Sequence, residues 1–187
     1  MEIIETELPG VVLIKPQVFN DPRGFFFESY RQDRLAKAGI AGNFVQDNHS
    51  RSTRGTLRGF HYQLRHPQAK LCRVVSGEVL DVALDIRRGS PTFGKSLEVV
   101  LSADNKLAMF IPEGFAHAFV VLSDQADFLY KCTDYYYPDD QYGIAWNDPE
   151  LGIDWRVGEP LLSEKDRGHL PLSKTPAQNL PTYGAAR

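Results

Sequence analysis

A dense group of ionisable and polar side chains lies in the segment GTLRGFHYQLRHPQAK, residues 55–70. Histidine exchanges a proton near neutral pH, and the cationic groups of arginine and lysine bind phosphoryl and carbonyl oxygens. Side chains of these types, close together in sequence, are suited to general acid–base chemistry. We therefore predict that this segment forms the reaction centre, with these candidate residues: Arg58, His61, Tyr62, Gln63 and Lys70.

Strand patterns follow this segment. From Val79 to Arg87, branched apolar residues alternate strictly with a more mixed set that includes charged residues. The branched set is Leu80, Val82, Leu84 and Ile86, and the other is Val79, Asp81, Ala83, Asp85 and Arg87. This period of two predicts a half-buried β-strand. Turn signals recur at a spacing of about ten residues, which is typical of antiparallel sandwiches and barrels. Further strands are predicted at 11–14, 43–50, 97–101, 107–111, 119–122 and 128–137, and short irregular strands at 143–149 and 153–155. The sequence therefore predicts an all-β fold.

The other segments support or cover these strands. Residues 31–39, RQDRLAKAG, combine good helix formers with a glycine suited to a helix end, and predict one short helix. Residues 51–55 are interpreted as a loop, and the chain from Gly158 onward as a peripheral wrap that becomes a flexible tail after about residue 180. We predict a single domain over residues 1–187. An aromatic run is interpreted as core packing in a strand: Phe25, Phe26, Phe27 and Tyr30.

Composition excludes several classes of partner. The formal net charge is −3 and the pI is near 5.9, so nothing in the overall charge favours nucleic acid or an anionic membrane. The N-terminal segment lacks the basic and apolar regions of a secretion signal, and no apolar stretch is long enough to span a bilayer. Cys72 and Cys132 form no metal or disulfide motif, and both are expected to be buried free thiols. We therefore expect a cytoplasmic protein.

Two motifs make the fold prediction more specific. Gly55 followed after five residues by His61 resembles the first cupin motif, and Pro112 to His117 resembles the second. This resemblance implies a cupin-type jelly roll, an antiparallel β-sandwich or barrel with a few short peripheral helices. Its metal site would need a second histidine and a glutamate, but Gln63 takes the histidine's place and neither alignment supplies a carboxylate, one of them giving Lys70. The metal site is therefore predicted to be lost, and His117 is either a ligand contact or a hydrogen-bonded barrel residue.

Ordered motifs from about Ile3 to Leu172 resemble the dTDP-4-dehydrorhamnose 3,5-epimerase family. They are DPRGFFFE from Asp21, QDNHS from Gln46, LRGFHYQ from Leu57, KL at Lys70, IPEGFAH from Ile111, YK at Tyr130 and LSEKD from Leu162. The resemblance implies an isomerase that inverts C3 and C5 of dTDP-4-dehydro-6-deoxy-D-glucose in dTDP-rhamnose biosynthesis. It also implies that no metal, nicotinamide or other cofactor takes part.

The resemblance assigns catalytic roles to four residues. His61 corresponds to the base, and Asp166 to the carboxylate that orients it. Lys70 corresponds to the cation near the C4 oxygen, and Tyr130 to the proton donor on the opposite face of the sugar. These types fit the chemistry, because a C4 ketone acidifies both neighbouring C–H bonds and epimerisation needs a base, an acid and an enolate stabiliser.

The resemblance also implies a binding site and a homodimer in which N-terminal residues complete the partner's site. Tyr136 would stack on thymine, and cations would contact the diphosphate. One family position, normally acidic, is occupied by Gln141. The predicted substrate-binding residues are Arg23, Glu28, Gln46, Asn48, Arg58, His117, Tyr136 and Lys165, of which Arg23 and Glu28 would serve the partner.

Three alternatives remain open at the level of the sequence. An epimerase of the same superfamily that inverts only one carbon would keep His61, Asp166 and Lys70 and differ near Tyr130. A sugar-binding or regulatory cupin would bind ligand without proton exchange. A metal-dependent cupin oxygenase would contain bound iron.

Overall fold

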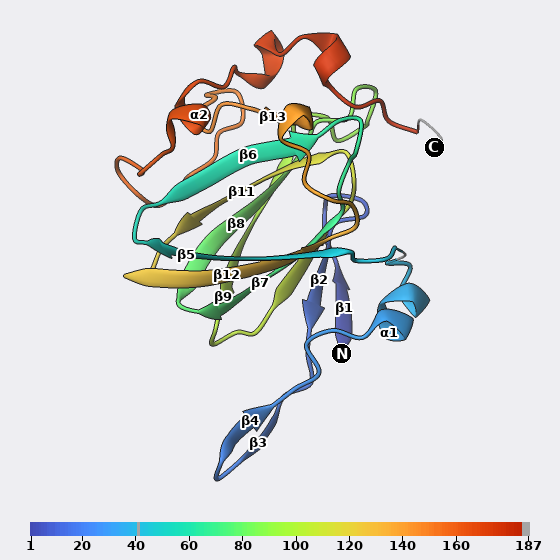
Figure 1. Cartoon of the computed structure of the whole chain (residues 1–187), viewed down its shortest axis with the longest axis vertical. Coiled ribbons are helices and arrows are strands. Elements are labelled where there is room, and N and C mark those ends of the chain that lie inside the picture. The colour runs from blue at the N-terminus through green and yellow to red at the C-terminus, as the bar shows by residue number, and fades with distance from the viewer. Residues whose placement is uncertain (41, 185–187) are drawn as a thin grey trace.

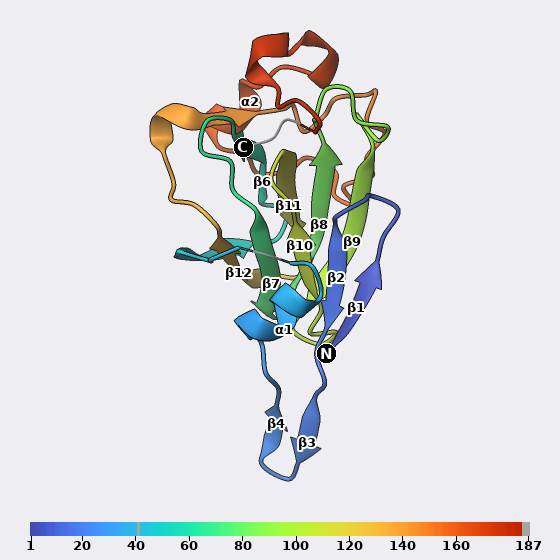
Figure 2. The same ribbon diagram turned by 90° about the vertical axis from the view of Figure 1, so that its right-hand side faces the viewer.

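The computed structural model describes residues 1–40 and 42–184, and consists mainly of two antiparallel sheets (Figures 1 and 2). The first sheet has the order β1-β2-β10-β7-β12-β5 and the second β13-β6-β11-β8-β9. The strands of the first are β1 Glu2–Glu5, β2 Val12–Lys15, β10 Ala108–Ile111, β7 Lys70–Ser76, β12 Gln125–Cys132 and β5 Gln46–Thr53. Those of the second are β13 Gln141–Gly143, β6 Leu57–Gln63, β11 Phe115–Val121, β8 Glu78–Asp85 and β9 Ser96–Ser102. The predicted all-β cupin-like class is confirmed.

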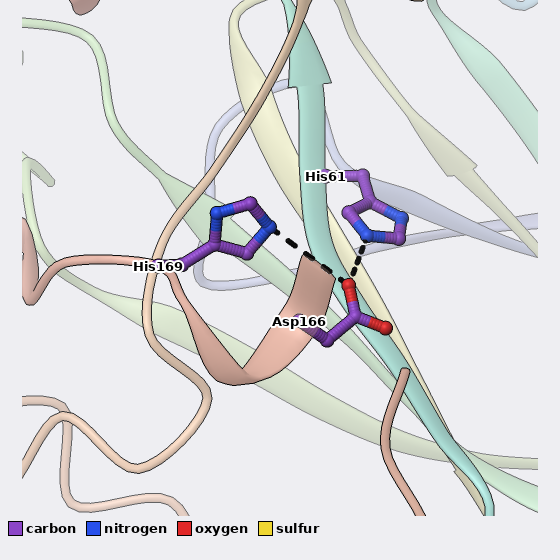
Figure 3. Close-up of side chains that lie close together, drawn as sticks. All are labelled: His61, Asp166 and His169. Atoms are coloured by element: carbon purple, nitrogen blue, oxygen red, sulfur yellow. Dashed lines mark hydrogen bonds and ion pairs between the residues drawn. The ribbon is translucent and has the colours of Figure 1, made fainter. Parts of the chain in front are cut away.

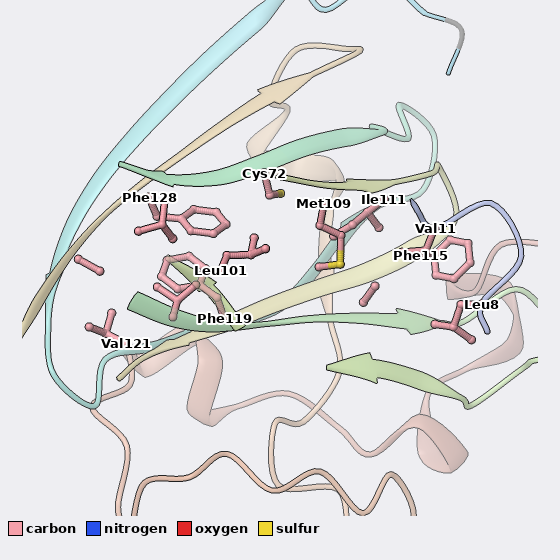
Figure 4. Packing of buried hydrophobic residues seen from close by; sticks show 14 residues of the cluster. Leu8, Val11, Cys72, Leu101, Met109, Ile111, Phe115, Phe119, Val121 and Phe128 are labelled. Carbon is pink, nitrogen blue, oxygen red and sulfur yellow. The ribbon is translucent and has the colours of Figure 1, made fainter. Parts of the chain in front are cut away.

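The main core lies between the sheets and is built largely from one face of β7, β8, β9, β10, β11 and β12 (Figure 4). On β8, Val79 and Ala83 belong to this core, whereas Leu80 and Val82 pack outward against Ile144, Trp155, Leu172 and Leu180 of the C-terminal segment. The prediction that this strand is half-buried was therefore wrong. Its alternation separates two apolar environments rather than core from solvent, because the C-terminal wrap covers the outer face.

The aromatic run near the N-terminus is the largest departure from the sequence-based interpretation. β3 Phe19–Asp21 and β4 Gly24–Phe26 form a separate two-stranded hairpin that projects from the body of the molecule (Figures 1 and 2). Phe26 is 70% exposed and Phe25 is 61% exposed. The prediction of core packing was wrong for Phe25 and Phe26, because strand periodicity cannot show whether another element covers the aromatic face. Tyr30, by contrast, packs against the buried cluster that contains Leu35 and Ile40.

Strand β5 is longer than predicted. Residues 51–53 were interpreted as a loop, but they pair with β12, with Arg51 opposite Asp127 and Thr53 opposite Gln125. The Arg51 guanidinium and the His49 imidazole both contact the Asp127 carboxylate. A polar sequence therefore forms an edge strand here because cross-strand ion pairs supply contacts that an apolar face would otherwise provide.

The helices are short. The predicted helix is confirmed as α1, Gln32–Lys37, and Gly39 follows it with a φ of 79°. The others are α2 Glu164–Arg167, η1 Pro138–Asp140, η2 Leu172–Lys174 and η3 Ala177–Asn179. Across the described ranges, none of these helices has the length and apolar character that crossing a membrane requires.

The C-terminal third contains less strand than predicted. Of the two irregular strands expected at 143–149 and 153–155, only the first overlaps a strand, at the last residue of β13. Trp155 instead donates from Nε1 to the carbonyl oxygen of Trp146 at 2.9 Å and packs on the outer face of the second sheet. In the segment expected to be a flexible tail, Leu180 is buried and Thr182 bridges to Arg88; residues 185–187 lie outside the described residues.

Candidate active site

A pocket of about 650 Å³ opens between the two sheets, lined by β5, β12 and β7 from one and by β6, β11 and β13 from the other. The segment that carries α2 closes part of its rim. All of the predicted site residues except Arg23 and Glu28 line this pocket: Gln46, Asn48, Arg58, His61, Lys70, His117, Tyr130, Tyr136, Lys165 and Asp166.

The pairing register of β5, β12 and β7 places several polar side chains on one wall of the pocket. Tyr130 on β12 lies between Asn48 on β5 and Cys72 on β7, and Cys132 lies between Gln46 and Lys70. Residues opposite one another in antiparallel strands, and residues two apart, share a face of the sheet. This places the Asn48, Gln46, Lys70 and Tyr130 side chains together, although they come from three separate strands.

A β-bulge in β6 brings two side chains together on the opposite wall of the pocket. Arg58 and His61 are three residues apart and would face opposite sides of a regular strand. Here Arg58 pairs with Phe119 and His61 with His117, so Gly59 and Phe60 of β6 together oppose Ala118 of β11. As a result, the Arg58 and His61 side chains both face the pocket. Gly59 permits this arrangement: its φ is 119°, and a Cβ there would lie 2.5 Å from the His117 carbonyl oxygen.

His61 and Asp166 form a hydrogen-bonded dyad (Figure 3). Nε2 of His61 lies 2.5 Å from Oδ1 of Asp166. The Ser163 hydroxyl caps α2 by accepting from the Asp166 backbone N–H at 3.1 Å, which fixes the start of this short helix. Burial raises the pKa of the Asp166 carboxyl, but the hydrogen bond and charge of His61 outweigh it and hold that pKa below its ordinary value. Asp166 is therefore a buried carboxylate directed at an imidazole.

Tyr130 faces the pocket from the other sheet. Burial raises the pKa of its phenol to about 12, so the hydroxyl keeps its proton at neutral pH and remains a donor. Nζ of Lys70 lies 5.9 Å from the centre of the Tyr130 ring. A neutral acid and a cation thus lie side by side, across the pocket from the His61–Asp166 dyad.

His117 lies on the pocket floor and makes a second buried His–Asp pair. Its Nε2 is 2.6 Å from Oδ1 of Asp81, and burial lowers the pKa of the imidazole despite the opposing effect of that carboxylate. Cys72 Sγ is 3.8 Å from the same nitrogen. The interpretation of His117 as a hydrogen-bonded barrel residue is therefore confirmed, and its place in the pocket lining leaves the ligand contact a prediction.

The far end of the pocket holds an exposed tyrosine cluster. The backbone N–H of Tyr136 donates to Oε1 of Gln46 at 2.9 Å. Oε1 of Gln141 accepts from the Tyr136 hydroxyl and from Nζ of Lys165, both at 2.7 Å. Gln141, where the family resemblance led us to expect an acidic residue, thus links the aromatic ring to a cation.

Gln63 holds this tyrosine segment in place. Its amide donates to the carbonyl oxygens of His66 at 2.7 Å and Tyr135 at 3.1 Å, and accepts from the Tyr137 N–H at 2.8 Å. The side chain at the position of a cupin metal ligand is therefore engaged by backbone groups of two loops.

Two predicted residues lie elsewhere in this chain. The Arg23 side chain is 90% exposed on the projecting hairpin and pairs with Asp21 at 2.6 Å. Glu28 pairs with Arg34 at 3.0 Å. Neither lines the pocket of its own chain.

Two residues of the site were not predicted from the sequence: Asp81, the buried partner of His117, and His169, which lies beside Asp166. An aspartate at an interior position of an alternating apolar strand was a usable signal for Asp81. For His169 the signal was only its spacing of three residues from Asp166.

The family model for dTDP-4-dehydrorhamnose 3,5-epimerase matches residues 5–174. The chain belongs to this family. It is 59% identical over 169 residues to the dTDP-4-dehydrorhamnose 3,5-epimerase of Pseudomonas aeruginosa, covering 89% of this chain and 93% of that protein. It is 40% identical to a dTDP-4-dehydrorhamnose 3-epimerase of Streptomyces niveus, covering 96% of this chain and 88% of that protein.

The fold of this epimerase agrees with that of solved family members. The dTDP-6-deoxy-D-glucose-3,5-epimerase of Legionella pneumophila, in complex with dTDP-4-keto-L-rhamnose, superposes with a TM-score of 0.96 at 50% identity. The match covers 98% of this chain and 99% of the Legionella chain. The family resemblance and the isomerase class expected from the sequence are confirmed.

Proposed function

We propose that this epimerase inverts C3 and C5 of dTDP-4-dehydro-6-deoxy-D-glucose to form dTDP-4-dehydro-L-rhamnose, a step of dTDP-rhamnose biosynthesis. The observation that carries the proposal is the placement of the His61–Asp166 dyad and the Tyr130 hydroxyl on opposite walls of one pocket. Inversion at carbon requires removal of a proton from one face and its return to the other. A pocket with a base and an acid on facing walls can do both.

His61 is the base. The Asp166 carboxylate can only accept hydrogen bonds, so the imidazole carries its proton on Nε2 and donates it to Asp166, which leaves Nδ1 as the proton acceptor. When Nδ1 takes a proton from the carbon beside the ketone, the C–H electron pair moves toward the C4 oxygen and forms an enolate. The negative charge of Asp166 stabilises the imidazolium formed in this step.

Lys70 and Tyr130 complete the reaction. The Lys70 ammonium stabilises the negative charge that develops on the C4 oxygen. The Tyr130 phenol donates its proton to the enolate carbon from the opposite wall, and the double bond returns to the C4 carbonyl. Solvent then takes the proton from the His61 imidazolium and returns one to the Tyr130 phenolate. The same sequence at the other carbon neighbouring the ketone gives the second inversion, and no redox cofactor is needed because no net electron transfer occurs.

The outer part of the pocket binds the nucleotide. Tyr136 stacks on thymine, Gln46 and Asn48 hydrogen-bond the nucleotide, and Arg58 and Lys165 contact the diphosphate. Support for this assignment is that the Gln46 amide and the Gln141 amide already fix the Tyr136 backbone and hydroxyl at the rim. His117 contacts the sugar from the floor.

We propose that the protein is a homodimer whose projecting hairpin completes the partner's site. Phe25 and Phe26 expose a large aromatic surface on this hairpin, which a second copy would bury. Arg23 and Glu28, which lie outside the pocket of their own chain, would then reach the pocket of the partner. We place the protein in the cytoplasm, a location that its free buried thiols Cys72 and Cys132 support.

Proton exchange at each carbon tests the proposal. The protein is incubated with dTDP-4-dehydro-6-deoxy-D-glucose in D2O, and the C3 and C5 hydrogens are followed separately by NMR. Loss of both signals supports the 3,5-epimerase. Exchange at one carbon identifies a single-carbon enzyme, as the Streptomyces relative is named, and binding without exchange identifies a sugar-binding cupin. Bound iron in stoichiometric amount would indicate an oxygenase.

A further inference from the structure

Two imidazoles approach one carboxylate at the edge of the pocket (Figure 3). Oδ1 of Asp166 lies 2.5 Å from Nε2 of His61 and 3.8 Å from Nε2 of His169. The His169 nitrogen is buried and has no hydrogen-bond partner among the described residues. A buried imidazole nitrogen that points at a carboxylate without bonding it calls for an explanation, because leaving such a group unsatisfied is costly.

The chain makes room for this imidazole. A Cβ at Gly143 would lie 2.2 Å from Nε2 of His169. Unlike most glycines of the chain, Gly143 does not have a φ in the left-handed region, so its backbone conformation does not require glycine. Gly143 pairs directly with His61 across β13 and β6. The missing side chain therefore seats the His169 ring beside the catalytic strand.

Three charged or titratable groups surround the His169 ring. They are His61 on β6 and Asp166 and Lys165 on α2, while β13 contributes only Gly143. Burial lowers the pKa of His169, and the charges of His61 and Lys165 act in the same direction against the opposing effect of Asp166. The imidazole is therefore neutral at neutral pH, and the Asp166 charge is left to His61.

We propose that His169 is a positioning residue: as a neutral imidazole seated on Gly143 it shields Asp166 and leaves that carboxylate to His61, and its protonation disables the dyad. A protonated His169 forms its own ion pair with Asp166. Its positive charge also opposes the charge that His61 acquires when it removes the substrate proton. This inference rests on the proposed role of His61 as base.

The pH dependence of turnover tests the inference. With saturating dTDP-4-dehydro-6-deoxy-D-glucose, C–H exchange is measured from pH 8 to pH 5 for the wild-type protein, for His169→Gln and for Arg167→Gln. His169→Gln keeps a polar side chain of similar reach but cannot titrate. Arg167→Gln removes a neighbouring exposed cation on α2 that does not line the pocket. Circular dichroism at each pH confirms that the variants remain folded.

The expected result is a difference in how steeply log kcat falls on the acid side of the pH profile. Because protonation of His169 disables the dyad, the acid limb of log kcat is steeper in the wild type than in His169→Gln by one unit of slope below the pKa of His169. The variant therefore gains on the wild type by about tenfold per pH unit in that range. Arg167→Gln keeps the wild-type slope. A purely structural role would lower the rate by the same factor at every pH.

Two results would overturn the inference. One is an acid limb of the wild-type profile that coincides with that of His169→Gln. The other is an NMR titration of the wild-type imidazole Cε1–H signals in which His169 already carries a proton at pH 8; this measurement needs no variant. Either result leaves the proposed function intact, whereas absence of C–H exchange in the wild type at every pH overturns the proposed function itself.

Discussion

Nε2 of His61 lies 2.5 Å from Oδ1 of Asp166 although 105 residues separate them in the chain. Because a carboxylate only accepts hydrogen bonds, this contact requires a proton on Nε2, and we propose that Nδ1 accepts the substrate proton. Of the side chains that we propose to contact the nucleotide, Gln46, Asn48 and Tyr136 lie on other segments than this dyad, whereas Arg58 shares β6 with His61 and Lys165 shares α2 with Asp166. We therefore expect proton abstraction and nucleotide binding to be largely separable.

His61→Ala is expected to lower C–H exchange by about 10²- to 10⁴-fold, the usual contribution of a general base. Affinity for dTDP should change little, because the ring and phosphate contacts come from other residues. Exchange is measured by NMR in D2O and affinity by calorimetry. Wild-type turnover in this variant would remove His61 from the mechanism.

Tyr130→Phe removes only the phenolic oxygen and is expected to separate the two half-reactions. Loss of the substrate hydrogen to solvent should continue, since His61 is unaffected, while formation of the inverted product slows by at least about tenfold. The ratio of deuterium exchange to product formation reports this directly. If both rates fall by the same factor, Tyr130 is not the donor.

Mixed dimers test whether the hairpin of one chain completes the active site of its partner. Arg23→Ala and His61→Ala are each expected to inactivate the homodimer. Coexpressed with different affinity tags, they should form a mixed dimer with one working site, because the His61→Ala chain supplies an intact Arg23 to the partner's intact His61. An inactive mixed dimer would show that Arg23 does not act across the interface.

Gln63→Leu is expected to loosen the tyrosine segment. The change leaves backbone groups of His66, Tyr135 and Tyr137 without their partner, at a cost of about 1–3 kcal/mol in the free energy of unfolding. KM should rise more than kcat falls, because we propose that Tyr136 binds the nucleotide and takes no part in proton transfer. Steady-state kinetics and urea unfolding measure both effects. The exposed Gln178→Leu serves as control, and equal effects in the two variants would contradict the role of Gln63.

Asp127 links stability to pH. Hydrogen bonds from Arg51 and His49 lower the pKa of its carboxyl to about 2 in the folded protein. A pKa depressed by folding adds stability above the unfolded value near 4, and this contribution is lost as the pH falls toward 2. Asp127→Asn should therefore lower Tm at pH 7 and have little effect near pH 2. Asp124→Asn, at an exposed ion pair, should change Tm little at either pH, and an equal fall in both variants would refute the assignment.

Local patterns in the sequence determined a large part of this protein. Helix formers ending at Gly39 gave α1, and the alternation from Val79 to Arg87 gave β8, because propensity and side-chain period act over a few residues. The motif residues His61, Tyr130 and Asp166 could be named because the family pattern marks them directly. The same resemblance implied their roles, and the chemistry of a C4 ketone explains why these residue types are needed.

Only the tertiary structure decided which side chains meet and which faces are covered. The bulge at Gly59 turns Arg58 and His61 to the same side, and the β5-β12-β7 register brings Asn48 beside Tyr130. The exposure of Phe26 and the approach of His169 to Asp166 were likewise invisible in the sequence. Both depend on pairing and packing between segments far apart in the chain, and a periodic pattern reports only local conformation.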